Sequence, residues 1–490
     1  MKARHAMLAA LVLQACAAGP DFRRPEAPPV QAYTREPLAE RTASAPVAGG
    51  AEQKFLRDRD IPRDWWTLYQ SPALNAIIES ALKANPNVQA AQAALRQAQE
   101  LAQAQAGFFF PTVQAGYART RQRDSATLSP ALASGESPFT LHTAQVTVSY
   151  APDVFGLNRR QVEALRAQAE AQSFQLEATY LSLTSNVVVA AVQEAALRAQ
   201  LAAALDIIAI NTRSVELLRK QFAAGAVAGI EVAAQEAALA QAQQALAPLR
   251  KQLEQTRNLL AALAGRYPAE GPGASFELTA LRLPEELPLS LPSRLVEQRP
   301  DVRAAEAQLH AASAQVGVAV ASMLPQFTIA AARGGTATQF GEMFASGNPF
   351  WSVVGTVTQT LFAGGTLFHR KRAAEAAFEQ AGALYRATVI GAFQNVADAL
   401  TALQSDADAL KAAAESERAA KVTLDLVTKQ LQFGLVNYLS LLNAQQAYQQ
   451  AVINRVQAQA GRFADTAALF QALGGGWWNR APDAAAGSTR

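Results

Sequence analysis

The chain has 490 residues, of which 50% are hydrophobic, only 7% are aromatic and 17% are charged, and alanine alone fills 110 positions. A chain of this length and composition can bury large cores, which excludes disorder of the whole. Lys and Arg total 43 against 40 for Asp and Glu, so there is no concentrated positive field and nucleic acid is not expected as a partner. The single cysteine excludes an internal disulfide framework and any multi-cysteine metal site.

The first 15 residues have the pattern of a signal peptide. A basic start leads into a short apolar stretch and a small residue before the cysteine: Lys2, Arg4, residues 7–12, Leu13, Gln14 and Ala15. The apolar stretch is too short for a spanning helix, which needs about 20 apolar residues. The pattern resembles a bacterial lipobox, so we expect residues 1–15 to be removed and Cys16 to carry covalent lipid, diacylglycerol and palmitate. The alternatives are an ordinary signal peptide cut after Ala18 or a free, buried Cys16.

Residues 16–64 are interpreted as a lipidated N-terminal arm. Ala17 stands where an aspartate would resemble an inner-membrane retention signal, so the outer membrane is favoured. The stretch 20–50 is rich in Pro, Ala, Gly and charged residues, which is typical of an extended arm rather than a packed element.

The rest of the chain is an internal duplication. Residues 85–93 match residues 299–307 at an offset of 214, and the same spacing from one proline to the next follows in both copies: Pro86 to Pro111 and Pro300 to Pro325. Such a long period is unlike a short-period solenoid. We therefore predict two repeats and a connecting, equatorial segment, with a flexible tail after the second repeat: residues 65–264, 265–292, 293–473 and 474–490.

Each repeat is predicted to hold a helix, two strands and a hairpin of two long helices. The hairpins cover about residues 157–264 and 366–473, because proline-free runs of helix-forming residues fill 157–222 and 366–433. At about 1.5 Å per residue each of these runs would extend roughly 100 Å, so neighbouring helices must support them. Pro248 is expected to kink or break the first returning helix. A soluble coiled coil would explain the helices and leave the strands unexplained.

Four strands are predicted at about residues 112–121, 142–150, 326–333 and 350–361, each with one polar and one apolar face. Such alternation over about ten residues is typical of a transmembrane β-barrel, the alternative being a half-buried soluble hairpin. Four strands cannot close, and an open edge in hydrocarbon leaves unpaired amides that cost several kcal/mol each. Other copies of the chain must therefore complete the barrel. Two copies give about eight strands with a nearly filled interior, whereas three give about twelve and leave a channel.

Several long motifs occur in order along the chain. They are Gly19-Pro20-Asp21-Phe22-Arg23-Arg24-Pro25, Trp65-Trp66, Leu82-Lys83-Ala84-Asn85-Pro86 and the segment 291–306 that contains Arg299-Pro300-Asp301-Val302. Together with the lipobox they resemble the outer membrane factor family, the NodT/OprM-type lipoprotein branch of the TolC-like efflux channels, over about residues 16–476. The resemblance implies a mainly α fold with a transmembrane β part. It also implies a homotrimer, with a twelve-stranded β-barrel in the outer membrane, an α-helical barrel through the periplasm and a girdle between them.

The resemblance also implies partners. They are a periplasmic adaptor (membrane fusion) protein and an inner-membrane pump, expected to be of the RND type, while this chain would be a passive conduit without a cofactor apart from its lipid. A type I protein secretion channel is the alternative within the same class. A lipid-anchored structural tether without a pore is the alternative from a different class.

The two hairpin turns are expected at the periplasmic mouth. Each needs a tight reversal, which glycine tolerates at positive φ. By resemblance the exposed tips are adaptor contacts, with plain helix C-caps as the alternative: Gly225, Val227, Gly434 and Leu435.

Residues 437–445 resemble the gate segment of the family. Leu439 would form an apolar constriction and Asn443 a neutral polar ring one turn away, unless Leu439 is simply interhelical core. Val436 is expected to belong to the gate as well. Val436 and Asn443 stand where the family often has acidic residues, so a negative ring is not expected here.

No catalytic constellation occurs in the sequence. The four histidines are isolated, no HExxH pair or phosphate loop is present, and the four methionines are scattered, so neither an enzyme nor a metal site is expected.

Overall fold

The computed structural model describes residues 17–57, 59–123 and 138–479. The signal peptide, Cys16 and residues 480–490 of the predicted tail therefore lie outside the described residues. The chain divides into two compact units, each built from parts of both repeats. Unit 1 takes in the chain up to Pro25, Ala94–Gln172 and Ala305–Tyr385, and unit 2 takes in Glu26–Ala93, Ser173–Ala304 and the chain from Arg386 on.

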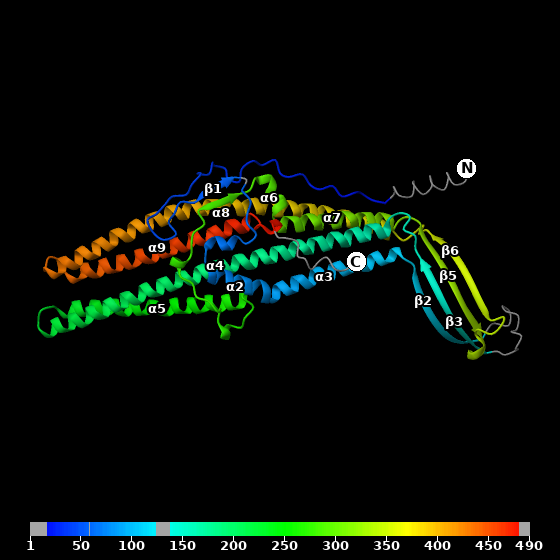
Figure 1. Ribbon diagram of the computed structural model, residues 1–490, viewed down its shortest axis with the longest axis horizontal. Coiled ribbons are helices and arrows are strands. Elements are labelled where there is room, and N and C mark those ends of the chain that lie inside the picture. Colours follow the sequence, from blue (N-terminus) through cyan, green and yellow to red (C-terminus); the bar gives the residue numbers. More distant parts are fainter. Residues whose placement is uncertain (1–16, 58, 124–137, 480–490) are drawn as a thin grey trace. The chain divides into compact units, whose positions relative to one another are not determined.

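The helices of the two repeats correspond one to one (Figure 1). The first repeat contains α2 (Pro72–Ala84), α3 (Pro86–Ala106), α4 (Leu157–Ala223) and α5 (Gly229–Leu263). The second contains α6 (Pro292–Gln298), α7 (Pro300–Ala321), α8 (Thr366–Gln432) and α9 (Tyr438–Ala472). Both long helices have 67 residues and both returning helices have 35, so the duplication extends to the length of the hairpins.

The single helix predicted before the strands is wrong in both repeats, because it is broken in two. The break lies at Asn85 in the first repeat and at Arg299 in the second, and both residues are extended because a proline follows. The Asn85 amide donates to the carbonyl of Leu263, and the Arg299 guanidinium donates to the carbonyl of Ala472, each over 2.9 Å. Each break is thus tied to the end of the returning helix of its own repeat.

Pro248 does not break α5, which is continuous from Gly229 to Leu263. Proline removes one intrahelical hydrogen bond, to the carbonyl of Gln244. Both residues are exposed, so water can solvate that carbonyl and the helix continues.

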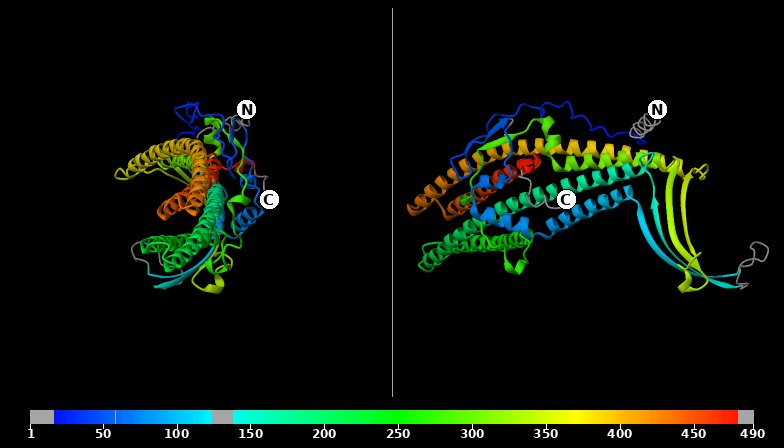
Figure 2. Two further views of the ribbon diagram at one scale, coloured as in Figure 1. Left: turned by 90° about the vertical axis from the view of Figure 1, so that its left-hand side faces the viewer. Right: turned by 45° about the vertical axis from the view of Figure 1, so that its right-hand side comes forward.

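In the part of the chain that the structure describes, six strands form two sheets. The larger sheet contains β2 (Thr112–Gln122), β3 (Phe139–Tyr150), β5 (Gln326–Ala337) and β6 (Pro349–Thr358), seen side by side in Figures 1 and 2. The prediction that the last strand reaches residue 361 is wrong: it ends at Thr358, which pairs with Gln326. Pro325 precedes Gln326 and has no N–H to extend the ladder.

A small parallel sheet in unit 2 was not predicted. It pairs β1 (Lys54–Arg57) from the arm with β4 (Glu286–Leu289) from the connecting segment. The second half of the arm is therefore packed and not merely extended. Arg462 of α9 is fully buried and donates to Thr42 Oγ1 over 2.8 Å and to the carbonyl of Ala51 over 2.7 Å.

The core of unit 2 also fixes the start of the predicted tail. Trp65 stacks on Phe470 of α9 with ring centroids 5.2 Å apart. The indole N–H of Trp477 donates to the carbonyl of Gln298 over 2.6 Å, and that of Trp478 donates to Asp60 over 2.9 Å. Residues 474–479 are therefore bound to the fold, contrary to the prediction of a flexible tail.

Two carboxyl groups share a partly buried position between α8 and α9. Burial, with Asp406 beside it, raises the pKa of Asp465 from 3.8 to about 7. Burial, with Asp465 nearby, raises the pKa of Tyr69, so its hydroxyl stays neutral, and the buried Arg462 guanidinium also faces this pair. Because Asp465 binds its proton more tightly in the folded state, its contribution to stability is largest at low pH and falls as pH rises from about 4 through 7.

We predict that Asp465→Asn raises the midpoint of thermal unfolding by several degrees at pH 8 and hardly changes it at pH 4, because the amide removes the cost of ionisation. Circular dichroism at 222 nm measures both midpoints. Asp408→Asn, at an exposed position of α8, is the matched control and should change neither. Equal shifts at both pH values would contradict the assignment.

Candidate channel and gate

The four-stranded sheet of unit 1 has two open edges. Its order is β2-β3-β5-β6 with every pair antiparallel, so β2 and β6 each have one side without a partner strand in the described part of the chain. Because the directions alternate, β6 of one copy runs antiparallel to β2 of the next when the edges meet. The edges are therefore complementary in direction.

The pairing register gives the sheet an apolar face and a polar face. One row across the strands is Val113, Val148, Ala331 and Val353, and the neighbouring row is Gln114, Thr147, Ala332 and Ser352. Side chains of adjacent rows point to opposite faces. This is the alternation of a strand with lipid on one side and water on the other.

Large apolar side chains gather where the strands meet the helices. These residues are Phe108, Phe109 and Phe110 before β2, Phe155 after β3, Phe327 in β5, and Leu361 and Phe362 after β6. Most are exposed, and the rings of Phe155 and Phe327 lie 6.3 Å apart. An aromatic girdle at this level is typical of a membrane interface. We call these residues the aromatic rim.

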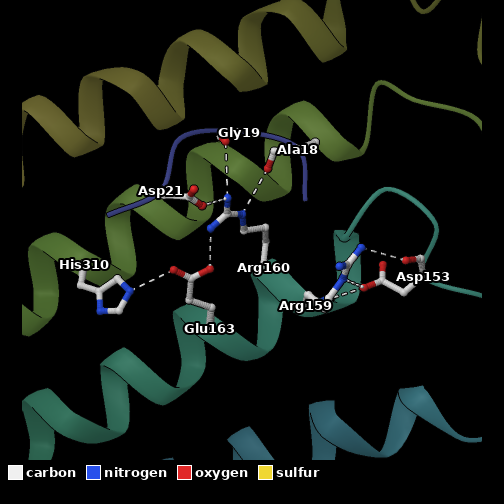
Figure 3. Close-up of polar contacts among 8 residues, drawn as sticks. All are labelled: Ala18, Gly19, Asp21, Asp153, Arg159, Arg160, Glu163 and His310. Carbon is white, nitrogen blue, oxygen red and sulfur yellow. Dashed lines mark hydrogen bonds and ion pairs between the residues drawn. The ribbon is translucent and has the colours of Figure 1, made fainter. Parts of the chain in front are cut away.

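The start of the arm is held in unit 1 by Arg160 of α4 (Figure 3). Its side chain is only 5% exposed and donates to Asp21 and to Glu163, each over 2.7 Å. It also donates to the carbonyl oxygens of Ala18 and Gly19 over 3.2 and 3.4 Å. We call this set of contacts the arm clamp.

The clamp extends to α7. The second carboxylate oxygen of Glu163 lies 2.9 Å from Nε2 of His310, on which the Phe22 ring stacks at 4.4 Å. Gly19 lies against the backbone of Gly317 with no room for a Cβ. The Ala18 N–H donates to the carbonyl of Phe155 over 3.0 Å, so the first described residues lie at the aromatic rim.

Arg160 is not among the site residues that the sequence predicts. The motif around Gly19, Asp21 and Phe22 was a signal, since all three residues are in the clamp, but nothing in the sequence pointed to a partner about 140 residues away.

Both hairpin turns use the same cap. The N–H of Gly225 donates to Phe222 and that of Gly434 to Leu431, while the next N–H reaches back to Gln221 or Gln430. This is the Schellman arrangement, and the glycines have φ of 74° and 70°. The turn residues Gly225, Gly434 and Leu435 are exposed, whereas Val227 is half-buried, so each hairpin has two of the four predicted contact positions at its end.

Leu439 and Asn443 are both exposed on α9 and lie four residues apart, on one helical face. Leu439 is 57% exposed, so it is not core of its own hairpin. Asn443 lines a groove of about 600 Å³ together with Gln446 and with Gln241 of α5. Val436 precedes the N-cap residue Asn437 and does not share this face.

A second apolar residue at the tips escaped the sequence analysis. Ile230 of α5 corresponds to Leu439 at the offset of 209 that separates Gly225 from Gly434, and it is 77% exposed. That offset was a signal that could have identified it. Both hairpins therefore present an exposed aliphatic residue at the start of the returning helix.

An open-edged sheet with an apolar face, joined to helical hairpins with exposed apolar tips, defines a subunit of an outer-membrane channel. The family model for outer membrane efflux proteins matches residues 77–266 and 291–475, one stretch in each repeat. The chain belongs to this family. It is the outer-membrane channel of an efflux pump and not an enzyme, and the predicted family, fold class, efflux role and outer-membrane location are confirmed.

Individual relatives are similar over nearly the whole chain. The pyoverdine export outer membrane protein OpmQ of Pseudomonas putida is 29% identical over 450 residues, covering 89% of this chain and 93% of that protein. The outer-membrane channel OprN has a TM-score of 0.83 at 26% identity, covering 94% of this chain and 100% of the other. VceC of Vibrio cholerae has a TM-score of 0.78 at 28% identity, covering 85% and 100%.

We predict that Arg160→Ala releases the start of the arm, because it leaves Asp21 and two backbone carbonyls without their donor. Limited proteolysis of the purified protein should then cleave within residues 17–25 at least several times faster than in the parent. Arg159→Ala is the matched control, since the side-chain hydrogen bonds of Arg159 in the described residues go to Asp153 and not to the arm. Equal cleavage of both variants would show that Arg160 does not hold the arm.

Proposed function

We propose that three copies of this chain close a twelve-stranded barrel in the outer membrane and conduct substrates delivered by a periplasmic adaptor protein and an inner-membrane pump of the RND type. The observation that carries the proposal is the pair of open edges on a sheet with one apolar face. Each unpaired amide in hydrocarbon costs several kcal/mol, so the edges need partners. Two copies would nearly fill the interior with side chains, whereas three leave a channel.

The stoichiometry predicts the mass of the assembly. Light scattering of the protein in detergent, corrected for bound detergent, should report three chains, and the same preparation should conduct in planar bilayers. No folded monomer should insert, because its two edges would face lipid. A stable monomeric pore would contradict the proposed trimeric barrel, and a trimer without conductance would favour a structural tether.

The gate is proposed at the hairpin tips. Leu439 and its counterpart Ile230 are exposed aliphatic residues at equivalent positions, so a trimer repeats each of them three times. A narrow apolar ring can dewet and resist ions without any charge. Asn443 adds a neutral polar ring one turn further along α9.

Leu439→Ala should raise the resting conductance severalfold by widening the apolar ring, whereas Asn443→Asp should chiefly increase cation preference by adding three carboxylates. Conductance and reversal potential under a salt gradient measure the two effects. Leu435→Ala is the control, because Leu435 lies in the turn before α9 and should leave resting conductance unchanged. If Leu439→Ala behaves like that control, the constriction lies elsewhere.

The hairpin tips are the proposed adaptor contacts. Gly225, Val227, Gly434 and Leu435 lie at the turns, and the neighbouring Phe433 is 80% exposed. Exposed apolar side chains at a small, repeated tip suit a protein partner that provides complementary apolar pockets.

Lipid on Cys16 is proposed as the anchor. The clamp supports this, because it holds Ala18 against Phe155 of the aromatic rim, two residues from Cys16. Acyl chains attached there can enter the adjoining leaflet without a long linker. Lipidation would thus add an anchor at the level where the strands already meet the interface.

Cys16→Ser should abolish incorporation of labelled palmitate and slow removal of residues 1–15. Gel fluorography and the apparent mass of the mature protein measure the two effects. Persistent palmitate label in the variant would show that the lipid is attached to another residue and that the predicted lipobox is wrong.

A further inference from the structure

The four strands contain basic side chains and no acidic ones. Arg119 and Arg121 lie in β2, His142 in β3 and Arg333 in β5, whereas no Asp or Glu occurs in any of the four strands. A membrane-spanning strand disfavours charge, so three arginines in one small sheet need a reason.

The register places all of these residues on the apolar face. Arg119 pairs with His142, and His142 pairs with Ala337 of β5. Arg333 pairs with Val146 and with Trp351. Each of these residues is an even number of positions from the member of the apolar row on its own strand, and side chains at even spacing point to the same face. The arginines therefore lie on the face that meets lipid and not on the face that lines the channel.

Their depth is also similar. β2 and β5 both begin where a helix ends, so depth can be counted from their first residues, Thr112 and Gln326. Arg119 and Arg333 each lie seven residues further along their strand, and Arg121 lies nine residues along β2. With a rise of about 3.3 Å per residue and a tilt near 45°, these steps correspond to roughly 16 and 21 Å. The apolar band of such barrels is about 25 Å tall, so the arginines belong to its outer half, and their long side chains can reach the outer headgroups.

Aromatic side chains accompany the arginines. Trp351 is 77% exposed and lies directly opposite Arg333. The Tyr117 hydroxyl lies 2.7 Å from Nδ1 of His142, and Phe340 packs edge-on against both rings. Aromatic rings at this height are typical of the outer interface, and planar guanidinium groups suit bidentate binding of phosphate.

We propose that Arg119, Arg121 and Arg333 bind the phosphate groups of lipopolysaccharide, the phosphorylated glycolipid of the outer leaflet. The proposal rests on the proposed closed trimer, in which β6 of one copy lies beside β2 of the next. Closure would bring Trp351 and Arg333 of one copy near Arg119 and Arg121 of its neighbour, so that a basic belt surrounds the barrel. The occupant is an outer-leaflet lipid because the side chains face outward and lie beyond the middle of the membrane.

The test uses the purified trimer in nonionic detergent, titrated with diphosphoryl lipid A while tryptophan fluorescence is followed. Lipid A should change the emission, and Trp351→Phe should abolish most of that change. The triple variant Arg119→Gln/Arg121→Gln/Arg333→Gln should need at least about tenfold more lipid for half-saturation, since it loses three charge-assisted contacts. Monophosphoryl lipid A and phosphatidylglycerol should bind the parent more weakly.

Control variants separate this surface from general charge effects. Arg370→Gln/Arg372→Gln removes two exposed arginines of α8 and should leave lipid A binding unchanged. The triple Lys variant keeps the charge but loses the bidentate geometry, so its half-saturation should lie between those of the parent and the triple Gln variant. Arg121→Gln alone, near the outer end of β2, should weaken binding about threefold. This single variant keeps the proposal testable if the triple Gln variant fails to fold.

Three outcomes would overturn the proposal. The first is equal half-saturation by lipid A for the parent, the Arg121→Gln variant and the triple Gln variant. The second is equal binding of phosphatidylglycerol and lipid A by the parent. The third is a shifted reversal potential in the triple Gln variant, which would place the arginines in the channel. Light scattering and conductance of the parent test the proposed trimeric channel separately, so failure of one proposal can be distinguished from failure of the other.

Discussion

The constraint on which this structure depends is the hydrogen-bonding of a sheet edge in lipid. Within a single chain, β2 and β6 have backbone groups that no described strand satisfies, and hydrocarbon offers no water in exchange. A further copy of the same chain can pair with each edge, because the two edge strands of an antiparallel four-stranded sheet run in opposite directions. The duplication fits this solution, since each repeat contributes one hairpin of strands to the sheet and one hairpin of long helices.

The sequence predicted those elements that depend on local pattern. Proline-free alanine-rich runs predicted the long helices within one residue at either end, and alternation predicted four strands, of which only β6 was placed too long. Glycines predicted the turns because a Schellman cap needs positive φ. The breaks at Asn85 and Arg299 could have been predicted as well, since each precedes a proline.

Elements that depend on distant partners could not be predicted. The strands β1 and β4 have four residues each, and their pairing joins segments more than 200 residues apart. The sequence around Arg160 is that of an ordinary helix, and its role depends on acceptors in the arm, such as the carbonyl of Ala18. Arg462 can be buried because the arm supplies acceptors for its guanidinium, such as the carbonyl of Ala51. The arginines of the apolar face were visible in the sequence, but which face they share follows from the register across three strands.

The near-identity of the two hairpins has a consequence for symmetry. Both have helices of 67 and 35 residues and the same turn, so a trimer displays six tips that are almost equivalent. They are not fully equivalent, because the Asn437 side chain caps α9 whereas Ala228 gives α5 no side-chain cap. The first turn of α5 is therefore the less stable of the two. Fraying of that turn in all three chains would change a pseudo-sixfold mouth into a strictly threefold one without moving the second hairpin.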